Sequence, residues 1–558
     1  MRSFRAIALA GSLICFALGT WLLSLSDQEI VALITELTGY DKPEKIARQL
    51  TASRLLLLRA LPFAAAALCS LIAWRPQPLL AVVHYVHDAL AFGREQVRAS
   101  YRSLLPWERA VWAVGCVLLA VHNAVNIVQV PAMVDEAMTW LLFTSRGPLV
   151  SATFYAAPNN HILHSLLTNL TSFLPGDPLV VMRIPTLFVG TATMALLYLL
   201  LRRVGDRNAA LLSWSMVVAS TPFLYYAYLS RGYMLVLFWM VTATGATLAL
   251  HRSGDKRAFR VLALACTGGL FTMPSFLYPA SILYAYLFFT SGGTGWNRWH
   301  VVRSGIVMGT LTAVLYAPGV VMSGIEAFTN NQWVRPISRS EVLSGWFAHF
   351  ESTFHWMTGA PFALFLCTGG VLAALLLGWR SRTTDGTLLA AVSVFASLAI
   401  PFLHSVIPFE RTWIYLLVPL GLSFTALLSN RYIAMLRAPA TVLLMSLSIL
   451  GGAWRFARQL PTIEYMAYDA QRMYAAVESI EPMDIYCEYT VLGDHLVFDL
   501  RKRGRSFTYT LSPEGAERER YLEDPAYTLL LVRSNAPIDH PRYRQLYADG
   551  IQRVYVPK

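Results

Sequence analysis

The chain contains about thirteen long stretches that are apolar and almost free of charge. Charged residues make up only 14% of the 558 residues, whereas a soluble domain has about 25%. A helix needs roughly 20 apolar residues to cross the hydrocarbon core of a bilayer, and its backbone groups must be satisfied internally. We therefore predict an all-α polytopic membrane protein with spans near residues 6–25, 55–74, 110–130, 180–201, 208–227, 232–250, 259–272, 274–290, 301–322, 361–379, 387–406, 412–428 and 438–453.

The basic residues are concentrated on alternate loops between these stretches. Loop 75–109 holds five arginines, whereas loop 131–179 has only Arg146 and loop 323–360 only Arg335 and Arg339. Because positive loops stay on the cytoplasmic side, the N-terminus is expected in the cytoplasm, and an odd span count places the C-terminus outside. We expect a multi-pass protein of the plasma (inner) membrane. The net charge of +12 then reflects orientation and contact with membrane lipids, not nucleic-acid binding.

Three regions follow from this pattern. Residues 1–109 hold two N-terminal spans and a cytoplasmic connector, residues 110–455 form the main membrane domain, and residues 456–558 form a soluble extracytoplasmic domain. Residues 1–25 also suit a signal peptide, but a retained span is favoured because Trp21-Leu22-Leu23 continues the apolar run. Loop 27–54 has helical spacing of apolar residues. The last domain should be α/β, with a helix over 465–480 and strands at 484–489, 507–511, 528–532 and 552–556.

Two adjacent carboxylates, Asp135 and Glu136, follow the third span by a few residues. They can simply mark the boundary between membrane and water. They can also supply a catalytic base where the head group of a lipid-borne substrate meets an aqueous acceptor. Adjacent residues on a helix differ by about 100° in direction, so we expect the two carboxylates to have separate roles.

Other polar groups lie at the outer boundaries of later spans. The segment Pro158-Asn159-Asn160-His161 precedes an apolar helix, Arg183 opens the next span, and Ser230-Arg231-Gly232-Tyr233 opens another. The amides also suit a turn or helix cap, and a lone histidine is often structural. Arginine at such a boundary either snorkels to the interface or binds a phosphate or carboxylate through two oxygens.

The order of these segments resembles a known group of enzymes. Asp135-Glu136-Ala137 is followed by the Asn-Asn-His segment, by Arg183-x-Pro185-Thr186, by Tyr226-x-x-x-Ser230-Arg231-Gly232-Tyr233, and by Phe409-Glu410-Arg411-Thr412-Trp413. Over residues 110–455 this is similar to membrane glycosyltransferases of the C-type superfamily (GT-C). The nearest branch is that of protein O-mannosyltransferases and aminoarabinose-transferase-like proteins.

The resemblance implies transfer of a hexosyl or pentosyl group from a polyprenyl-phosphate donor to a glycan, lipid or protein acceptor outside the membrane. Asp135 matches the essential acidic residue of the family, and a carboxylate that deprotonates the acceptor favours inversion. The candidates for binding the donor phosphate or the substrate are Asn160, His161, Arg183, Arg231, Tyr233 and Arg411. The pattern identifies no definite cofactor, and a divalent cation with Glu136 as a ligand is compatible with it.

Two features depart from the family pattern. Pro158-Asn159-Asn160-His161 stands where the family has Lys- or His-Pro-Pro, which leaves open which residue meets the phosphate, and the two N-terminal spans have no counterpart. The alternatives are a transporter, a lipid-linked glycan flippase or a ligase for whole glycans. A transporter would place charges inside its spans and repeat broken helices in two halves, a pattern that the sequence does not contain.

Overall fold

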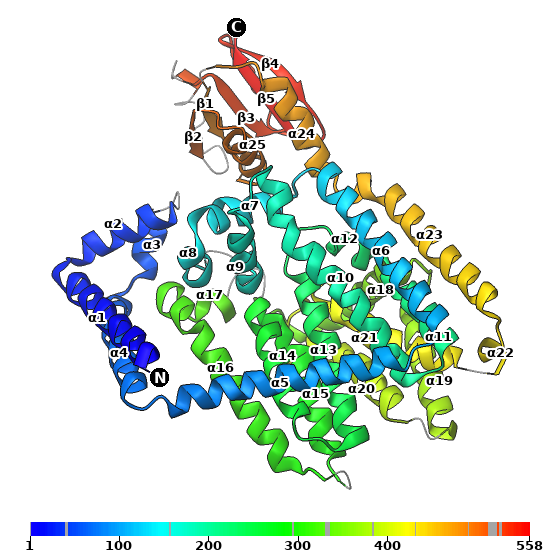
Figure 1. The fold of residues 1–558 in the computed structure, drawn as a ribbon. Coiled ribbons are helices and arrows are strands. Elements are labelled where there is room, and N and C mark those ends of the chain that lie inside the picture. The colour runs from blue at the N-terminus through cyan, green and yellow to red at the C-terminus, as the bar shows by residue number, and fades with distance from the viewer. Residues whose placement is uncertain are drawn as a thin grey trace.

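Each of the thirteen apolar stretches is helical over most of its length in the computed structural model (Figure 1). The structure describes residues 2–39, 43–155, 158–292, 295–329, 335–381, 384–429, 431–481, 483–488, 490–511, 522–523 and 527–558. Within these ranges, nine helices are long and apolar enough to span a membrane, or ten if one bent pair counts as a span. The chain is therefore an integral membrane protein.

A count of thirteen spans is not confirmed, because several apolar stretches form short or broken helices. The stretch 208–227 divides into α11 (Arg207–Val218) and α12 (Thr221–Tyr226). Met273-Pro274 separates α14 (Ala258–Thr272) from η2 (Pro274–Phe276) and α15 (Leu277–Thr290). Proline at the start of α12 and η2 cannot continue a preceding helix. Helix α18 (Arg339–Thr358) and α19 (Ala363–Ser381) bend by 76°.

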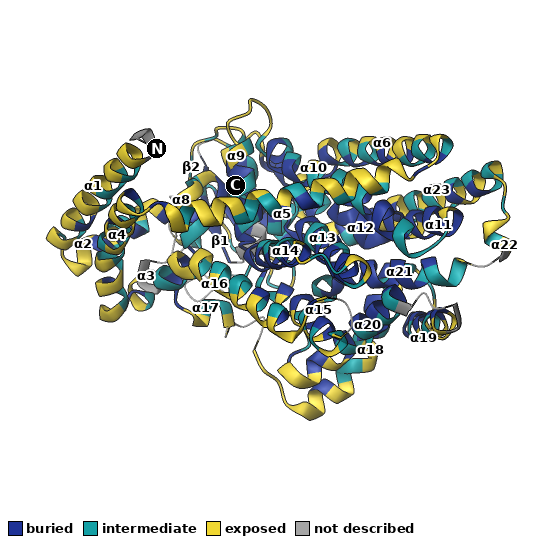
Figure 2. Cartoon of the chain, turned by 60° about the horizontal axis from the view of Figure 1, so that its bottom comes forward, coloured by how far each residue is buried: buried dark blue, intermediate teal, exposed yellow. Residues whose placement is uncertain are grey.

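Helices α10 and α13 form the centre of the membrane bundle, and both are buried along much of their length (Figure 2). Around them lie α6, α11, α14 and α21, while α16 and α23 are mostly exposed, as expected of helices facing lipid. The bounds of the remaining bundle elements are α6 Pro106–Gln129, α7 Val134–Leu142, η1 Thr144–Arg146, α8 Pro148–Thr153, α9 Ile162–Thr171, α10 Pro178–Val204, α13 Tyr233–Ser253, α16 Arg298–Ser323, α17 Glu326–Thr329, α20 Thr384–His404, η3 Glu410–Leu416, α21 Leu417–Leu428, α22 Arg431–Ala434 and α23 Ala438–Ile463.

The N-terminal region stands beside the bundle. Helix α1 (Arg2–Ser24) packs along α4 (Ala52–Trp74), where the Ser12 hydroxyl donates to the carbonyl of Ala66 (2.9 Å). The helical character of loop 27–54 is confirmed by α2 (Asp27–Thr38) and α3 (Pro43–Gln49). The connector contains an unpredicted helix, α5 (Gln77–Arg102), which runs across the bundle (Figure 1). Its apolar side meets α10 and α14 while its basic side is exposed.

The C-terminal domain is a small α/β unit, as predicted. Its sheet has the order β2-β1-β3-β5-β4, with β1 parallel to β2 and β3, and β5 antiparallel to β3 and β4. Residue 489 of the first predicted strand lies outside the described residues; β4 and α25 were not predicted. The bounds are α24 Tyr465–Val477, β1 Met483–Cys487, α25 Thr490–Lys502, β2 Phe507–Leu511, β3 Leu529–Arg533, β4 Tyr543–Ala548 and β5 Gln552–Pro557.

Candidate functional site

The two adjacent carboxylates, Asp135 and Glu136, lie in the first turn of α7 and point in different directions. Glu136 is fully buried, whereas the side chain of Asp135 is 25% exposed. The backbone N–H of Met133 donates to the Glu136 carboxylate (3.0 Å) at the N-terminus of α7, where a negative charge is favoured by the helix dipole. Asp135 and Glu136 therefore have different surroundings, in agreement with the separate roles expected from the angle between adjacent residues on a helix.

Glu136 forms a buried ion pair with Arg183 of α10. Nε and Nη2 of Arg183 donate to the two Glu136 oxygens at 2.8 and 2.5 Å. The remaining guanidinium N–H groups donate to the carbonyls of Ile127, Val130 and Pro131 at 2.8–3.0 Å. All five N–H donors of Arg183 are thus used within the protein. This geometry assigns Arg183 to holding α6, α7 and α10 together and leaves it no donor for a lipid phosphate.

Asp135 lies between two arginines from distant parts of the chain. Its Oδ2 is 3.5 Å from Nη2 of Arg231, at the start of the α13 segment, and 3.4 Å from Nη1 of Arg411 in η3. Both distances exceed those of tight charge-assisted hydrogen bonds, which are about 2.7–2.9 Å. The two arginines therefore surround the carboxylate without binding it closely, and they remain available to a second anion.

Arg231 is held in place by a ring of acceptors. Its Nη1 donates to the Asn159 side-chain oxygen, to the Asn159 carbonyl (3.2 Å) and to the Thr139 hydroxyl (3.1 Å). Asn159 in turn donates to the Asp135 carbonyl at 3.1 Å. Asn159 and Thr139 thus fix the arginine beside Asp135. Neither was among the site residues predicted from the sequence, although Asn159 belongs to the predicted Asn-Asn-His segment and Thr139 follows Asp135 by one helical turn.

His161 presents an N–H group next to the Arg231 guanidinium. The backbone N–H of Gly232 donates to His161 Nδ1 (2.8 Å), so the proton of the neutral ring is on Nε2, which lies 3.5 Å from Arg231 Nη2. Burial, and then the positive charge of Arg231, hold the pKa of His161 well below its usual value, which keeps the ring neutral. The two N–H donors cannot bond to each other, but an anion placed between them could accept from both.

This close approach requires glycine at position 232. A Cβ there would lie 2.9 Å from the Cβ of His161 and from Cγ2 of Thr272. The ring of His161 also meets that of Tyr233 edge to face at 5.1 Å. Tyr233 therefore orients the histidine. The side chain of Asn160 points elsewhere and donates to the carbonyls of Ser151 and Phe154 at 2.9 and 3.0 Å, so it stabilises the loop.

Arg411 also lines a cavity of about 610 Å³ beside this cluster. The cavity is bounded by α12, the end of α18, η3 and the end of α23. Its wall contains both polar and aromatic side chains, among them Tyr226, Trp356, Glu410 and Arg458. The arginine that borders Asp135 therefore also faces a space large enough for a sugar and its phosphate.

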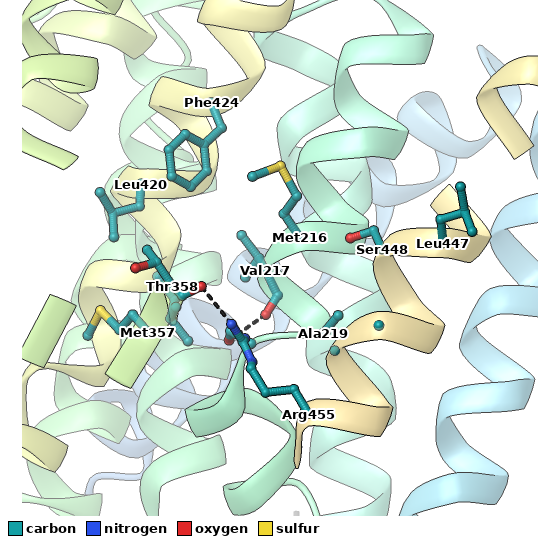
Figure 3. A pocket seen from close by; sticks show the side chains of 14 residues that line it. Met216, Val217, Ala219, Met357, Thr358, Leu420, Phe424, Leu447, Ser448 and Arg455 are labelled. Atoms are coloured by element: carbon teal, nitrogen blue, oxygen red, sulfur yellow. Dashed lines mark hydrogen bonds between the residues drawn. The ribbon is translucent and has the colours of Figure 1, made fainter. Parts of the chain in front are cut away.

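An apolar groove with a smaller volume, about 320 Å³, adjoins this cavity (Figure 3). Ser220 and Thr358 line the groove, and the next residues, Thr221 and Gly359, line the cavity. Met216 and Leu447 at its margin are 46% and 58% exposed, so the groove opens to the lipid-facing side. Arg455 lies at its polar end and donates to the Thr358 carbonyl (2.7 Å). Arg455 follows Trp454 at the end of the last apolar run and was not among the site residues predicted from the sequence.

Glu464, between α23 and α24, is a further buried carboxyl close to the cluster. Burial raises its pKa to about 8, with Glu136 adding to the shift and Tyr225 and Arg183 opposing it. The carboxyl is therefore mostly protonated at neutral pH when the protein is folded, whereas it is ionised in the unfolded chain. Stability consequently falls as pH rises from the unfolded pKa of 4.5 to about 8.

Replacing Glu464 with glutamine should remove this pH-dependent loss. Each pKa unit corresponds to about 1.4 kcal/mol, so the gain at pH 8 is on the order of a few kcal/mol. We expect the melting temperature of Glu464→Gln in detergent to match wild type at pH 5 and to exceed it at pH 8. Equal melting temperatures at both pH values would show that Glu464 is already ionised in the folded protein.

The described residues contain no group of three or more His, Cys, Asp and Glu side chains arranged to hold a metal ion. Glu136, the residue expected to bind a divalent cation if one is used, has its oxygens occupied by Arg183, by the Ser230 N–H (2.6 Å) and by the Met133 N–H. The geometry around Glu136 therefore fits an arginine partner and not a metal ion.

The helix arrangement defines a polytopic membrane protein with a fold similar to that of ArnT. Residues 158–321 match the family model of dolichyl-phosphate-mannose-protein mannosyltransferases. Crystal structures of ArnT from Cupriavidus metallidurans, in the apo state and bound to undecaprenyl phosphate, each match with a TM-score of 0.58 and 14% identity, covering 80% of this chain and 97% of ArnT. No curated protein sequence matches. The predicted resemblance is confirmed at the level of the fold.

Proposed function

We propose that the protein transfers a sugar from a polyprenyl-phosphate donor to an acceptor on the outer side of the membrane. The observation that carries this proposal is the position of Asp135, between Arg231 and Arg411. Arg411 borders a cavity that adjoins an apolar groove open to lipid. A lipid-linked sugar phosphate has matching parts: an apolar tail for the groove, an anionic phosphate for the arginines and a polar sugar for the cavity.

In this mechanism Asp135 acts as the general base. The acceptor hydroxyl attacks the anomeric carbon, the bond from that carbon to the phosphate oxygen breaks, and polyprenyl phosphate leaves with the bonding electron pair. The hydroxyl proton passes to Asp135. Arg231, Arg411 and the His161 Nε2–H stabilise the charge that develops on the departing phosphate. When the phosphate engages the arginines, Asp135 is released from them to take the proton.

Supporting this assignment, the ArnT structure with a related fold is one that binds undecaprenyl phosphate. In this chain we place the phosphate at Arg231, Arg411 and His161. Glu136 and Arg183 position α7, Tyr233 orients His161, and Asn159 holds Arg231. Asn160, expected to bind the donor phosphate or the substrate, stabilises the loop instead. Neither the sugar nor a hexosyl or pentosyl preference follows from these contacts.

Replacing Arg411 should weaken donor binding more than folding. A hydrogen bond to a charged group contributes about 1.5–3 kcal/mol, so we expect Arg411→Ala to weaken binding of undecaprenyl phosphate about tenfold to a hundredfold. Arg411→Lys should recover only part, because lysine cannot bind two oxygens at once. Binding is measured by thermal shift or native mass spectrometry of the purified protein.

The matched control is Arg98→Ala on the exposed side of α5, a helix that lines neither the cavity nor the groove. It should bind the lipid like wild type. If Arg411→Ala also binds undecaprenyl phosphate like wild type, Arg411 does not meet the phosphate and the proposed donor site is wrong.

The proposed orientation places the N-terminus in the cytoplasm and the C-terminal domain outside, in the plasma (inner) membrane. The physical reason is the positive charge of loop 75–109, which contains α5. A reporter fused after Lys558 that requires export should be active, and the same reporter fused before Met1 should be inactive. Activity of a cytoplasm-only reporter at Lys558 would reverse the assignment and move the site to the cytoplasmic face.

A further inference from the structure

A second cavity, of about 210 Å³, lies where the C-terminal domain meets the membrane domain. Pro131, Ala132 and Leu179 of the membrane domain form one wall, and residues of α24 and α25 form the other. It shares no lining residue with the cavity that contains Arg411. Pro131 and Ala132 precede Asp135 by only a few residues, so this second cavity approaches the proposed base from the side of the soluble domain.

The C-terminal domain is fixed against the membrane domain at this point. Phe498 of α25 packs edge to face on Trp140 of α7 with ring centroids 5.4 Å apart, and both belong to a cluster that includes Ala137 and Met182. Nζ of Lys502 lies 2.5 Å from Asp177 Oδ2 at the start of α10. The helix that carries Asp135 and the helix that lines the cavity thus pack as one unit (Figure 1).

The charged groups at the edge of the cavity are largely neutralised by ion pairs. Lys502 pairs with Asp177, and Arg503 pairs with Glu478 at 2.7 Å. Burial raises the pKa of Asp499 to about 6, with Lys502 and Arg503 opposing the shift. The cavity therefore offers no free cluster of positive charge for a phosphate, and its apolar lining is limited to Pro131, Ala132, Leu179 and two alanines of α24.

Two polar side chains of the cavity lining have atoms that lack hydrogen-bond partners within the part of the chain that the structure describes. They are His495 Nε2 and the Tyr474 hydroxyl, on residues that are only 2% and 3% exposed. Burial lowers the pKa of His495 to about 4, so its ring is neutral at pH 7. A buried polar group without a partner costs about 1–3 kcal/mol, a cost that a bound molecule with hydroxyl groups would relieve.

We infer that this cavity binds a hydroxyl-rich saccharide unit of the acceptor, and that the acceptor is therefore a glycan. An imidazole, a phenol, a carboxyl group and the Gln471 amide supply the mixed donors and acceptors that sugar hydroxyls require. The volume is smaller than the 300–1,000 Å³ typical of drug-sized sites, which suits a single sugar ring. This inference rests on the proposed function, because the acceptor reacts at Asp135.

Ligand-observed saturation-transfer NMR tests the site without requiring turnover. The probes are methyl glycosides of hexoses, pentoses and N-acetylhexosamines, added to the full-length protein in nanodiscs, with a serine-containing peptide as the competing acceptor class. We expect at least one glycoside to receive saturation and the peptide to receive none. Asp499→Asn and Tyr474→Phe should each weaken the signal severalfold, whereas Asp539→Asn, on the exposed far part of the same domain, should not.

Melting temperatures near that of wild type establish that the variants fold. Absence of any glycoside signal, or a signal that all variants retain, would overturn the saccharide site; binding of the peptide alone would assign the cavity to a protein acceptor. The proposed function is tested separately by release of labelled sugar from the lipid donor. Glycoside binding without donor cleavage would leave the cavity as a sugar site and refute the transferase.

Discussion

Asp135→Asn should abolish sugar transfer while leaving the protein folded and able to bind its lipid donor. The amide keeps the size of the side chain but cannot accept the acceptor's proton. A general base contributes about 10²–10⁴-fold to rate, so turnover should fall at least a hundredfold. The side chain is partly exposed and only loosely paired with Arg231 and Arg411, so the melting temperature should change little. The measurement is the initial rate of transfer at saturating donor.

Glu136→Gln is the matched control, since it makes the same chemical change at the adjacent residue. Its amide oxygen can still accept, but its NH2 group cannot accept from the N–H donors that meet the second carboxylate oxygen, and the charge that pairs with Arg183 is lost. It should therefore lower stability more than Asp135→Asn and activity less. Full-rate transfer by Asp135→Asn would remove Asp135 as the base. If Glu136→Gln were inactive and stable, the two roles would have to be exchanged.

Arg183→Met should cause the largest loss of stability of any single replacement at the site. Removing one partner of a buried ion pair costs about 3–5 kcal/mol, because the other charge remains buried and unpaired. Here the change also leaves three backbone carbonyls of the α6–α7 segment without their donor. We expect a marked fall in melting temperature and in the yield of monodisperse protein.

The double replacement Glu136→Gln with Arg183→Met distinguishes a structural pair from a catalytic one. Because it removes both charges, it should recover part of the stability lost in Arg183→Met. A stable Arg183→Met protein that binds donor poorly would instead support the original expectation that Arg183 meets the substrate.

The membrane fold could be predicted from the sequence because each span is a continuous apolar stretch that can be recognised without knowledge of the rest of the chain. Every predicted apolar stretch is helical, and the order of short polar segments was sufficient to identify the fold. The span count could not be predicted equally well, because Pro222 and Pro274 interrupt apolar runs whose hydropathy continues across the break. The amphipathic helix α5 was missed because its apolar residues are spaced around one face and never form a long run.

The candidate site was predicted in part. The sequence placed Asp135, His161, Arg231 and Arg411 at outer boundaries, and the structure brings them together. The sequence could not show that Glu136 and Arg183, 47 positions apart, form a buried ion pair with each other. The sequence also could not show that Asn159, and not Asn160, contacts Arg231. The choice between them depends on the direction of each side chain in an irregular loop. The position of His495 near Asp135 could not be predicted either, because it depends on how the C-terminal domain packs against the membrane domain.

The central claim is that this protein breaks the bond between a sugar and polyprenyl phosphate and passes the sugar to an acceptor. The most direct measurement follows a radiolabelled sugar on polyprenyl phosphate, incubated with the purified protein in nanodiscs and a glycan fraction from the cell envelope. The account predicts that label moves from the lipid to the glycan with wild-type protein and not with Asp135→Asn. Label that stays on the lipid, while the intact lipid-linked sugar crosses a vesicle bilayer, would contradict the account and identify a flippase.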